Sequence, residues 1–465
     1  MRKKLFVLTA VLVVGLVMLP AAVAQYDTCK CGTPKCKYEH MRAPMPHEML
    51  EGQPLTPQKA PSHGGRGTWE FMGPEGGTFA VCAVDPADPN IATIMASGGS
   101  VYNTTDGGAS WNFMSSTPHY AYDAAAGHGA IYILGYNPDT FTYDISFTND
   151  NGATWTSLNG PGGTDTPYSI ALHPTDPDTI FVGGYFYNSS GPHLYEPWFH
   201  VTTDGGANWT STDLASYGWM VPFGIDVSAN NPDVIYMGGY DYDISSYTIM
   251  GACLASTDGG ATWTYSYTSA NPSEYPTGVY IDPTDDLHVI APGTHYMESF
   301  DGGATWQTHS YGLVYHYGLA FDPTNSLNIY MAGSDGLFVS NDGGVNWTVN
   351  DVGGMAYYPA VCAGTPSTIY SACYYVGVVK SIDSGATWDN VCNGILESRV
   401  YGVEVAQSSP NRVYSSPYGF TAFQVSEDSG ENWNEINIPP EGTYVYIALE
   451  NSNQPDNLLV SLPGG

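Results

Sequence analysis

Short runs of apolar residues recur along the chain, and turn-forming residues separate them. Runs such as YSIAL (168–172) and YGLAF (317–321) are followed by an Asp-Pro or similar turn and then by runs such as TIFVGG (179–184) and NIYMAG (328–333). Apolar runs of this length, bounded by turn residues, are typical of β-strands. A third strand then leads into a tight turn, and a fourth follows it. The pattern predicts units of four strands, A to D.

The predicted turn between strands C and D carries one motif eight times: a hydroxyl residue, any residue, Asp, any residue, Gly, two further residues and Trp. Successive aspartates are 44, 54, 54, 43, 41, 41 and 45 residues apart, and a Trp stands five residues after each. Repeats of this length indicate one four-stranded sheet each. The aspartates are Asp106, Asp150, Asp204, Asp258, Asp301, Asp342, Asp383 and Asp428.

The motif has a structural interpretation. The Asp carboxylate can accept N–H groups of the turn, the hydroxyl two residues earlier can close it, and the Gly two residues later can adopt positive φ. Burial of the large Trp ring then stabilises the sheet. We therefore expect these eight aspartates to be structural.

The repeats predict an all-β protein, a single β-propeller of eight Asp-motif blades plus a partial ninth, with four-stranded antiparallel blades. The propeller is assigned to residues 68–465. A lone strand at 68–72 precedes the first blade, and two strands of the ninth unit lie at 443–462. Three explanations for the incomplete blade are open: the first strand closes it, another copy donates a strand, or the C-terminus is truncated.

Residues 1–24 resemble a secretory signal, with three basic residues, an apolar run and the small-x-small site Ala22-Val23-Ala24. No later segment approaches 18 consecutive apolar residues. We expect a protein that is secreted or held at the cell surface, without membrane insertion.

Residues 25–67 form a Cys- and Pro-rich arm or linker. Its Cys29, Cys31 and Cys36 match no zinc spacing, so we expect no metal and no cofactor. A local disulfide with a spare thiol predicts disulfide-linked self-association. Cys362 and Cys373 flank a short predicted turn, and they are expected either to bond across a hairpin or to remain buried thiols.

Charge excludes several partners. The whole chain has a formal net charge of −33, and the region from Thr68 onward carries 41 acidic and only three basic residues, a formal charge of −38. Nucleic acid and anionic lipid require Lys and Arg against their phosphates, so neither is expected to bind.

The eight motifs, among them TTDGGASW (104–111) and STDGGATW (256–263), resemble the Asp-box or BNR repeat. The resemblance implies a propeller of the sialidase, xyloglucanase and sortilin-like superfamily, in which the boxes lie away from the ligand face and identify the fold rather than the activity.

The resemblance also discriminates between members of that superfamily. Sialidases bind their substrate with three arginines, whereas only Arg399 and Arg412 follow the arm. Photosystem assembly factors present a basic patch, and sortilin-like receptors add a cysteine-rich module; neither feature is present in this sequence. The segment TWEFMGPEGG (68–77) looks like the opening strand of xyloglucanase-like propellers. Their Arg-Thr-Asp-like first repeat is replaced here by Asn103-Thr104-Thr105-Asp106, which puts hydrolysis in doubt.

Aromatic residues follow each D strand, in the loops expected to surround one mouth of the channel. Rings with a polar edge suit stacking against sugars. The alternative is that they pack blade against blade. The candidate ligand-binding residues are Tyr122, Tyr168, Trp219, Tyr275, Tyr317, Tyr358, Tyr401 and Tyr446.

Two carboxylates, Asp226 in FGIDV and Glu404 in YGVEV, occupy equivalent positions in predicted A strands. Glycoside hydrolysis needs two carboxyl groups, so they are the candidate catalytic pair. Weaker candidates in the predicted entry loops are Asp123, Asp165, Glu274 and Glu397. Three functions remain open: a recognition propeller that binds polysaccharide or another surface component, a xyloglucanase-like glycoside hydrolase, and a structural subunit of an extracellular assembly.

Overall fold

The computed structural model describes residues between 79 and 461. The predicted signal, the arm and the lone strand predicted at 68–72 lie outside this range. Short internal stretches are also outside the described residues, and the longer ones are 138–141, 162–165, 189–193, 310–314, 393–399, 406–410, 418–422, 429–433 and 437–446, the last of which includes Tyr446.

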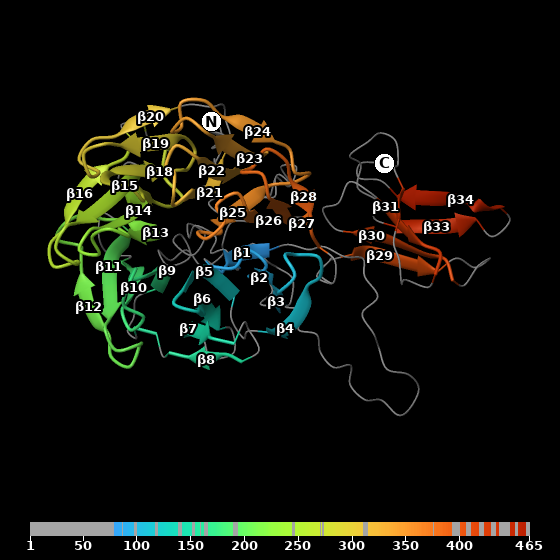
Figure 1. Cartoon of the computed structure of the whole chain (residues 1–465), viewed down its shortest axis with the longest axis horizontal. Coiled ribbons are helices and arrows are strands. Elements are labelled where there is room, and N and C mark those ends of the chain that lie inside the picture. Colours follow the sequence, from blue (N-terminus) through green and yellow to red (C-terminus); the bar gives the residue numbers. More distant parts are fainter. Residues whose placement is uncertain are drawn as a thin grey trace, which may run out of the picture.

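Seven four-stranded antiparallel sheets follow one another around a ring, and each contains one predicted unit in the order A, B, C, D (Figure 1). The B and C strands are longest in blades 2, 3 and 4. Blade 1 contains β1 (Phe79–Val84), β2 (Ala92–Ala96), β3 (Ser100–Thr104) and β4 (Asn112–Ser116). Blade 2 contains β5 (Tyr120–Gly127), β6 (Ala130–Asn137), β7 (Thr142–Thr148) and β8 (Thr156–Ser157). Blade 3 contains β9 (Thr166–Leu172), β10 (Ile180–Tyr187), β11 (Tyr195–Thr202) and β12 (Thr210–Asp213).

Four further blades complete the ring. Blade 4 contains β13 (Val221–Val227), β14 (Ile235–Asp243), β15 (Thr248–Ser256) and β16 (Thr264–Tyr267). Blade 5 contains β17 (Tyr280–Asp282), β18 (Asp285–Ala291), β19 (Tyr296–Ser299) and β20 (Gln307–His309). Blade 6 contains β21 (His316–Phe321), β22 (Ile329–Gly333), β23 (Gly336–Ser340) and β24 (Thr348–Asn350). Blade 7 contains β25 (Ala356–Val361), β26 (Ile369–Cys373), β27 (Gly377–Ser381) and β28 (Asp389–Asn390).

The predicted blade number is wrong, because the ring closes after seven blades. Strand β1 of blade 1 contacts β25 and β26 of blade 7. One buried cluster spans this seam and includes Ile94 and Trp111 from blade 1 and Cys362 and Tyr370 from blade 7. Lys380 of blade 7 also donates a hydrogen bond to the carbonyl of Gly107 over 2.6 Å. These contacts occupy the face of blade 7 that an eighth blade of the ring would need.

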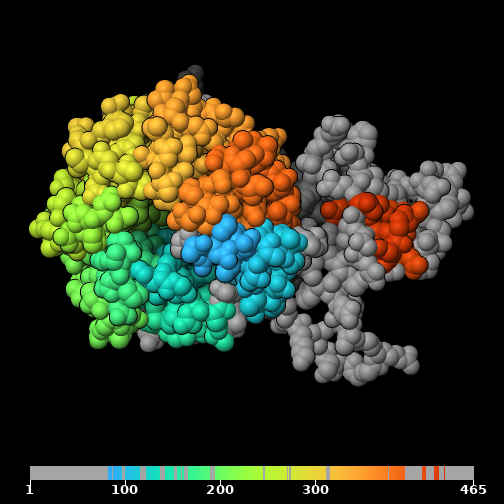
Figure 2. Space-filling model, viewed as in Figure 1, coloured from blue at the N-terminus to red at the C-terminus, as the bar shows by residue number. Residues whose placement is uncertain are grey.

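The eighth unit forms a sheet of its own, and the predicted ninth unit contributes two strands. The eighth sheet contains β29 (Val400–Val405), β30 (Val413–Pro417), β31 (Phe423–Ser426) and β32 (Asn434–Ile436), and the last pair is β33 (Ile447–Asn451) with β34 (Gln454–Ser461). All six strands lie outside the ring, beside blades 1 and 7 (Figure 1). In the space-filling view, the coloured part of this sheet is a separate lobe (Figure 2).

The Asp motifs form the C–D turns, as their sequence predicts. In blade 5, one Asp301 carboxylate oxygen accepts the Thr305 backbone N–H over 2.8 Å and the Ser299 hydroxyl over 2.9 Å. Gly303, two residues after the Asp, has a φ of 81°, and the Trp306 indole N–H donates to its carbonyl. The motif therefore fixes a turn.

The five cysteines of the described ring are free thiols. Cys362 and Cys373 therefore form no disulfide in the structure. Both are fully buried thiols, the second of the two predicted alternatives. No helix in the described part of the chain is long and apolar enough to cross a membrane.

Candidate functional site

The A strands of neighbouring blades contact one another around the ring axis (Figure 1). As the innermost strand of its sheet, each A strand has backbone N–H groups along its inner edge with no strand to pair with. Two aspartates of A strands meet such N–H groups. Asp226 lies in β13, an A strand, as the sequence predicts, whereas Asp123, predicted in an entry loop, lies in the A strand β5.

Both aspartates bridge neighbouring A strands in the same way. The Asp226 carboxylate accepts the N–H of Val227 over 2.9 Å and that of Ile281, in the next blade, over 2.8 Å. The Asp123 carboxylate accepts the N–H of Ala124 over 2.8 Å and that of Ile170, in the next blade, over 2.9 Å. Each carboxylate therefore satisfies one N–H of its own strand and one of its neighbour, which explains how a charged residue is tolerated there.

Removal from water disfavours the charged form of these groups. Burial raises the pKa of Asp123 to about 7 and that of Asp226 to about 6, although the backbone N–H donors act in the opposite direction. A carboxyl group that exchanges a proton near neutral pH can serve as a general acid or base. The pKa values of Asp123 and Asp226 both lie in that range. The hydrogen bonds of both carboxylates to the backbone also give each a structural role that is sufficient to explain its position.

Two tyrosines complete what we call the axial group: Asp123, Asp226, Tyr280 and Tyr358. Burial raises the pKa of Tyr280, with smaller contributions from the charges of Asp123 and Asp226, and the Leu319 backbone hydrogen-bonds to it. Burial likewise raises the pKa of Tyr358, followed by the charges of Asp123 and Tyr280. The four side chains, contributed by blades 2, 4, 5 and 7, therefore form one electrostatically coupled set.

The predicted catalytic pair is not brought together. Asp226 belongs to the ring, whereas Glu404 lies in β29, which belongs to the sheet outside the ring (Figure 1). Only the backbone of Glu404 is described. The residue that shares the axis with Asp226 is Asp123, one of the weaker candidates. The sequence predicts an entry-loop position for Asp123, but β5 begins at Tyr120 and places it within the A strand.

The predicted ligand-binding aromatics differ in exposure. Tyr122, Tyr168, Tyr275 and Tyr317 are buried, with 3–9% of their surfaces exposed. Trp219 and Tyr358 are partly exposed. Tyr401 lies in β29, where only the backbone is described, and Tyr446 lies outside the described residues. The burial of the first four tyrosines agrees with the alternative that they pack blade against blade.

Blades 2, 3 and 4 share a continuous cluster that we call the tyrosine belt. Ring centroids of Tyr122 and Tyr168 are 5.2 Å apart, those of Tyr168 and Phe223 are 5.3 Å apart, and those of Phe223 and Tyr240 are 5.1 Å apart. These distances are typical of attractive aromatic pairs. The tyrosines of the belt are Tyr122, Tyr136, Tyr143, Tyr168, Tyr185, Tyr187, Tyr195, Tyr240, Tyr242 and Tyr275.

The belt makes the ring asymmetric. The B and C strands of blades 3 and 4 have eight or nine residues, whereas those of blades 1, 6 and 7 have five. The additional length accounts for the 54-residue spacings of the Asp motifs and extends the side of the ring that carries the B–C turns and the D–A loops. We call this side the D–A face; the Asp motifs lie on the other. Tyr136, Tyr143, Tyr187 and Tyr242 of the belt remain partly exposed.

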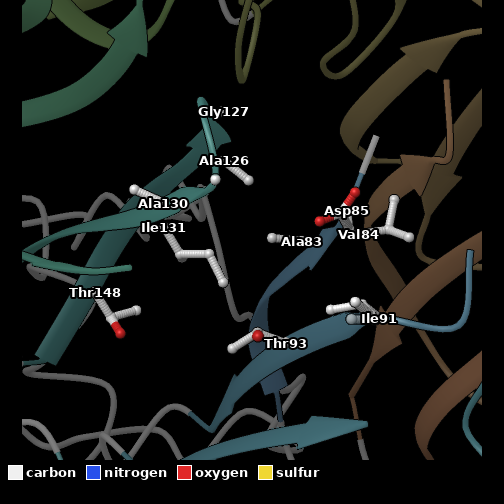
Figure 3. A pocket seen from close by; sticks show the side chains of 12 residues that line it. Ala83, Val84, Asp85, Ile91, Thr93, Ala126, Gly127, Ala130, Ile131 and Thr148 are labelled. Atoms are coloured by element: carbon white, nitrogen blue, oxygen red, sulfur yellow. The ribbon is translucent and has the colours of Figure 1, made fainter. Parts of the chain in front are cut away.

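A small pocket lies between blades 1 and 2, near their A–B turns (Figure 3). Ala83, Thr93, Ala126, Ile131 and Thr148 are among its lining residues. Its single carboxylate, Asp85, accepts the backbone N–H groups of Ala87 and Asp88. The pocket therefore resembles a gap in the packing between two blades, and its lining residues include no second acid or base.

A buried charge network in blade 5 was not anticipated. His288 lies between Asp282 and Glu298, with nitrogen–oxygen distances of 2.8 Å to each. His309 is 3.0 Å from the second Glu298 oxygen. The two carboxylates raise the pKa of His288 to about 9, although burial opposes them. Within the described residues, no group of three or more His, Cys, Asp or Glu side chains is arranged to hold a metal ion.

The ring of four-stranded blades and the hydrogen-bonded Asp motifs define the fold of the chain as a β-propeller with Asp-box turns. Comparisons with known proteins agree with this fold. No family model matches the sequence. The chain is 25% identical, over 280 residues, to a Neosartorya fischeri protein named "Probable oligoxyloglucan-reducing end-specific xyloglucanase". The match covers 52% of this chain and only 33% of that relative, so the chain spans about a third of its length.

A solved structure shows the same similarity of fold. A xyloglucanase of glycoside hydrolase family 74 from Xanthomonas campestris superposes with a TM-score of 0.55 at 14% identity, covering 80% of this chain and 69% of that one. At 14% identity this similarity concerns the fold alone. A microbial sialidase, Hz136, superposes with a TM-score of 0.41 at 14% identity over 64% of this chain and 72% of the other.

Proposed function

We propose that the chain is an extracellular recognition propeller that binds polysaccharide through the tyrosine-rich D–A face of its ring. The observation that carries the proposal is the tyrosine belt on the extended blades 2 to 4. Packing inside the belt fixes the rings, so little side-chain entropy is lost when a ligand binds to its exposed members. Phenol rings combine an apolar face with a polar hydroxyl, which matches the alternating apolar and hydroxylated surfaces of sugars.

Charge supports a polysaccharide over other polymers. The propeller region carries a formal charge of −38, so nucleic acids and anionic lipid surfaces would be repelled. Secretion of the chain, as its first 24 residues predict, would place it where polysaccharides are abundant, and we include it in the proposal.

A glycoside hydrolase of the xyloglucanase-like type is the second candidate. It is favoured by the 25% identity to a xyloglucanase and by the raised pKa values of Asp123 and Asp226. Their bridging hydrogen bonds weigh against it, because both carboxylates already satisfy backbone donors.

Two measurements on the same samples separate the candidates. Affinity electrophoresis through gels containing a soluble polysaccharide reports binding, and reducing-sugar release reports hydrolysis. Retardation without release supports the recognition function. If sugar is released, and if Asp226→Asn or Asp123→Asn abolishes the release while the variant stays folded, hydrolysis replaces recognition as the function. Absence of both retardation and release across neutral, acidic and amino-sugar polysaccharides would overturn the proposal.

A further inference from the structure

Four aromatic residues gather at the outer seam between blades 3 and 4, away from the ring axis. Tyr217 and Trp219 lie in the loop that joins β12 to β13, and Tyr265 and Tyr267 lie in β16. Strands β12 and β16 are the outermost strands of their sheets (Figure 1). Tyr267 is 49% exposed and Tyr217 is 38% exposed, in contrast to the buried rings of the tyrosine belt. We call these four residues the seam platform.

The seam platform is held in place by its own hydrogen bonds. The Tyr265 hydroxyl donates to the Trp219 carbonyl over 3.2 Å, which ties β16 to the loop. Tyr265 and Tyr267 pack edge to face, with centroids 5.4 Å apart and an interplanar angle of 81°. A Cβ atom at Gly218 would clash with the Tyr265 ring, so only glycine allows the loop to lie this close to the ring.

The loop is also fixed from its other end. Asp213 accepts the Ala215 N–H over 2.8 Å, and the Tyr217 N–H donates to the Leu214 carbonyl over 2.9 Å. Leu214 is fully buried. An exposed tyrosine on a loop constrained in this way presents its ring without a large ordering cost on binding.

Charge near the seam platform indicates what it can bind. The described basic residues Lys380 and Arg412 lie in blade 7 and in the outer sheet, and each has a partner, the Gly107 carbonyl and Glu427 respectively. No cation of the described chain therefore faces a polyanion at the seam between blades 3 and 4. The nearby Asp213 accepts a backbone N–H of its turn, and Asp241 is only 4% exposed.

We propose that the seam platform is a binding site for an uncharged polysaccharide chain, whose sugar rings stack on Tyr267 and Tyr217. This inference rests on the proposed polysaccharide-binding function and gives it a location outside the ring axis. Stacking on an aromatic face needs no neutralising charge, and the phenol hydroxyls at the ring edges can hydrogen-bond sugar hydroxyls.

Affinity electrophoresis in hydroxyethyl cellulose, which is uncharged, tests the site with the full chain. Tyr267→Ala is expected to weaken retardation about three- to tenfold, the range of a single aromatic contact, and Tyr267→Phe to retain it. Phe113→Ala is the matched control, because Phe113 is 46% exposed in β4, the D strand of blade 1. Polygalacturonate, a polyanion, is expected to give no retardation of the wild type.

The outcomes separate this inference from the broader function. If the wild type is retarded, and Tyr217→Ala and Tyr267→Ala are retarded as much as the wild type, the seam platform is not the binding site. The proposed polysaccharide binding then still stands. If the wild type is retarded by no polysaccharide, both proposals fail. If sedimentation shows that Tyr267→Ala dissolves a dimer without changing retardation, the seam platform is a contact between copies and the inference is overturned.

Discussion

The hydroxyl of Tyr370, in blade 7, donates a hydrogen bond to the carbonyl of Pro89, in blade 1, over 3.0 Å. Tyr236 of blade 4 makes the same contact with the Asp286 carbonyl of blade 5, also over 3.0 Å. Both tyrosines lie in B strands; Pro89 lies in the A–B turn of its blade, and Asp286 lies at the start of β18, just after the A–B turn of its blade. Blades 7 and 1 are therefore joined by the same kind of hydrogen bond that joins the consecutive blades 4 and 5, although 281 residues separate Tyr370 from Pro89.

Removal of this hydroxyl is expected to weaken the closing seam. Tyr370→Phe should lower the free energy of unfolding by about 0.5–1.5 kcal/mol, because the hydrogen bond is lost and the Pro89 carbonyl loses its donor. Tyr236→Phe should have a similar effect at an internal seam. Tyr247→Phe is the control, since Tyr247 is 63% exposed. Urea unfolding of the three variants provides the measurement, and an unchanged Tyr370→Phe would argue against closure at this seam.

Closure after seven blades also predicts that the outer sheet is dispensable for the ring. A chain ending at residue 392 keeps every seam contact described between blades 7 and 1, so its thermal unfolding midpoint should match that of the full chain. A chain ending at residue 350 loses blade 7 and should unfold at a much lower temperature or fail to fold. Near-ultraviolet circular dichroism would follow both. Collapse of the longer chain would mean that the sheet from β29 to β32 belongs to the ring.

The bridging aspartates predict a pH dependence of stability. In the folded chain the pKa of Asp123 is raised to about 7 and that of Asp226 to about 6, from the ordinary value of 3.8. The folded state therefore binds these protons more tightly than the unfolded state. Their contribution to stability is fully present below about pH 4 and is lost as the pH rises to about 7.

Substitution isolates this contribution. Asp123→Asn and Asp226→Asn should each flatten the decline of unfolding free energy between pH 4 and pH 7, because the amide does not titrate. The absolute stability of the variants is less informative, since an amide oxygen replaces only part of the two-fold acceptance by the carboxylate. Unfolding by urea at half-unit pH intervals gives the slope. Identical slopes for wild type and both variants would show that neither group titrates in this range.

Much of this fold could be predicted from the sequence, because the Asp motifs act locally. The contacts of Asp301 lie within four residues of it, so the motif alone determines the turn and the order of strands. The number of blades depends on the long-range seam between Ile94, Trp111 and Tyr370, and the eighth motif is no different from the others in sequence. The local regularity of the motifs therefore led to a prediction of eight blades plus a partial ninth, whereas the ring has seven.

The candidate site was harder to predict for the same reason. Asp226 and Glu404 occupy equivalent positions in their units, but equivalence within a repeat does not determine whether two repeats share an axis. Asp123 directly follows an irregularity in the pairing of β5 with β6, between Ala121 and Asp123. A motif-based alignment of the repeats does not show this irregularity. The seam platform depends on packing between Gly218 and Tyr265, 47 residues apart, which no local pattern reveals.

The network around His288 predicts a loss of stability at alkaline pH. Its pKa is raised to about 9 by Asp282 and Glu298, so the stabilisation from its charge is fully present below about pH 6.5 and is lost as the pH rises through 9. His288→Gln should lower the free energy of unfolding at pH 7 by about 3–5 kcal/mol, because two buried carboxylates then face each other without a cation. The double variant His288→Gln, Glu298→Gln should recover part of that loss, since one of the two charges is removed. Urea unfolding at pH 7 and pH 9.5 measures both effects, and equal stability of the single and double variants would contradict the electrostatic explanation.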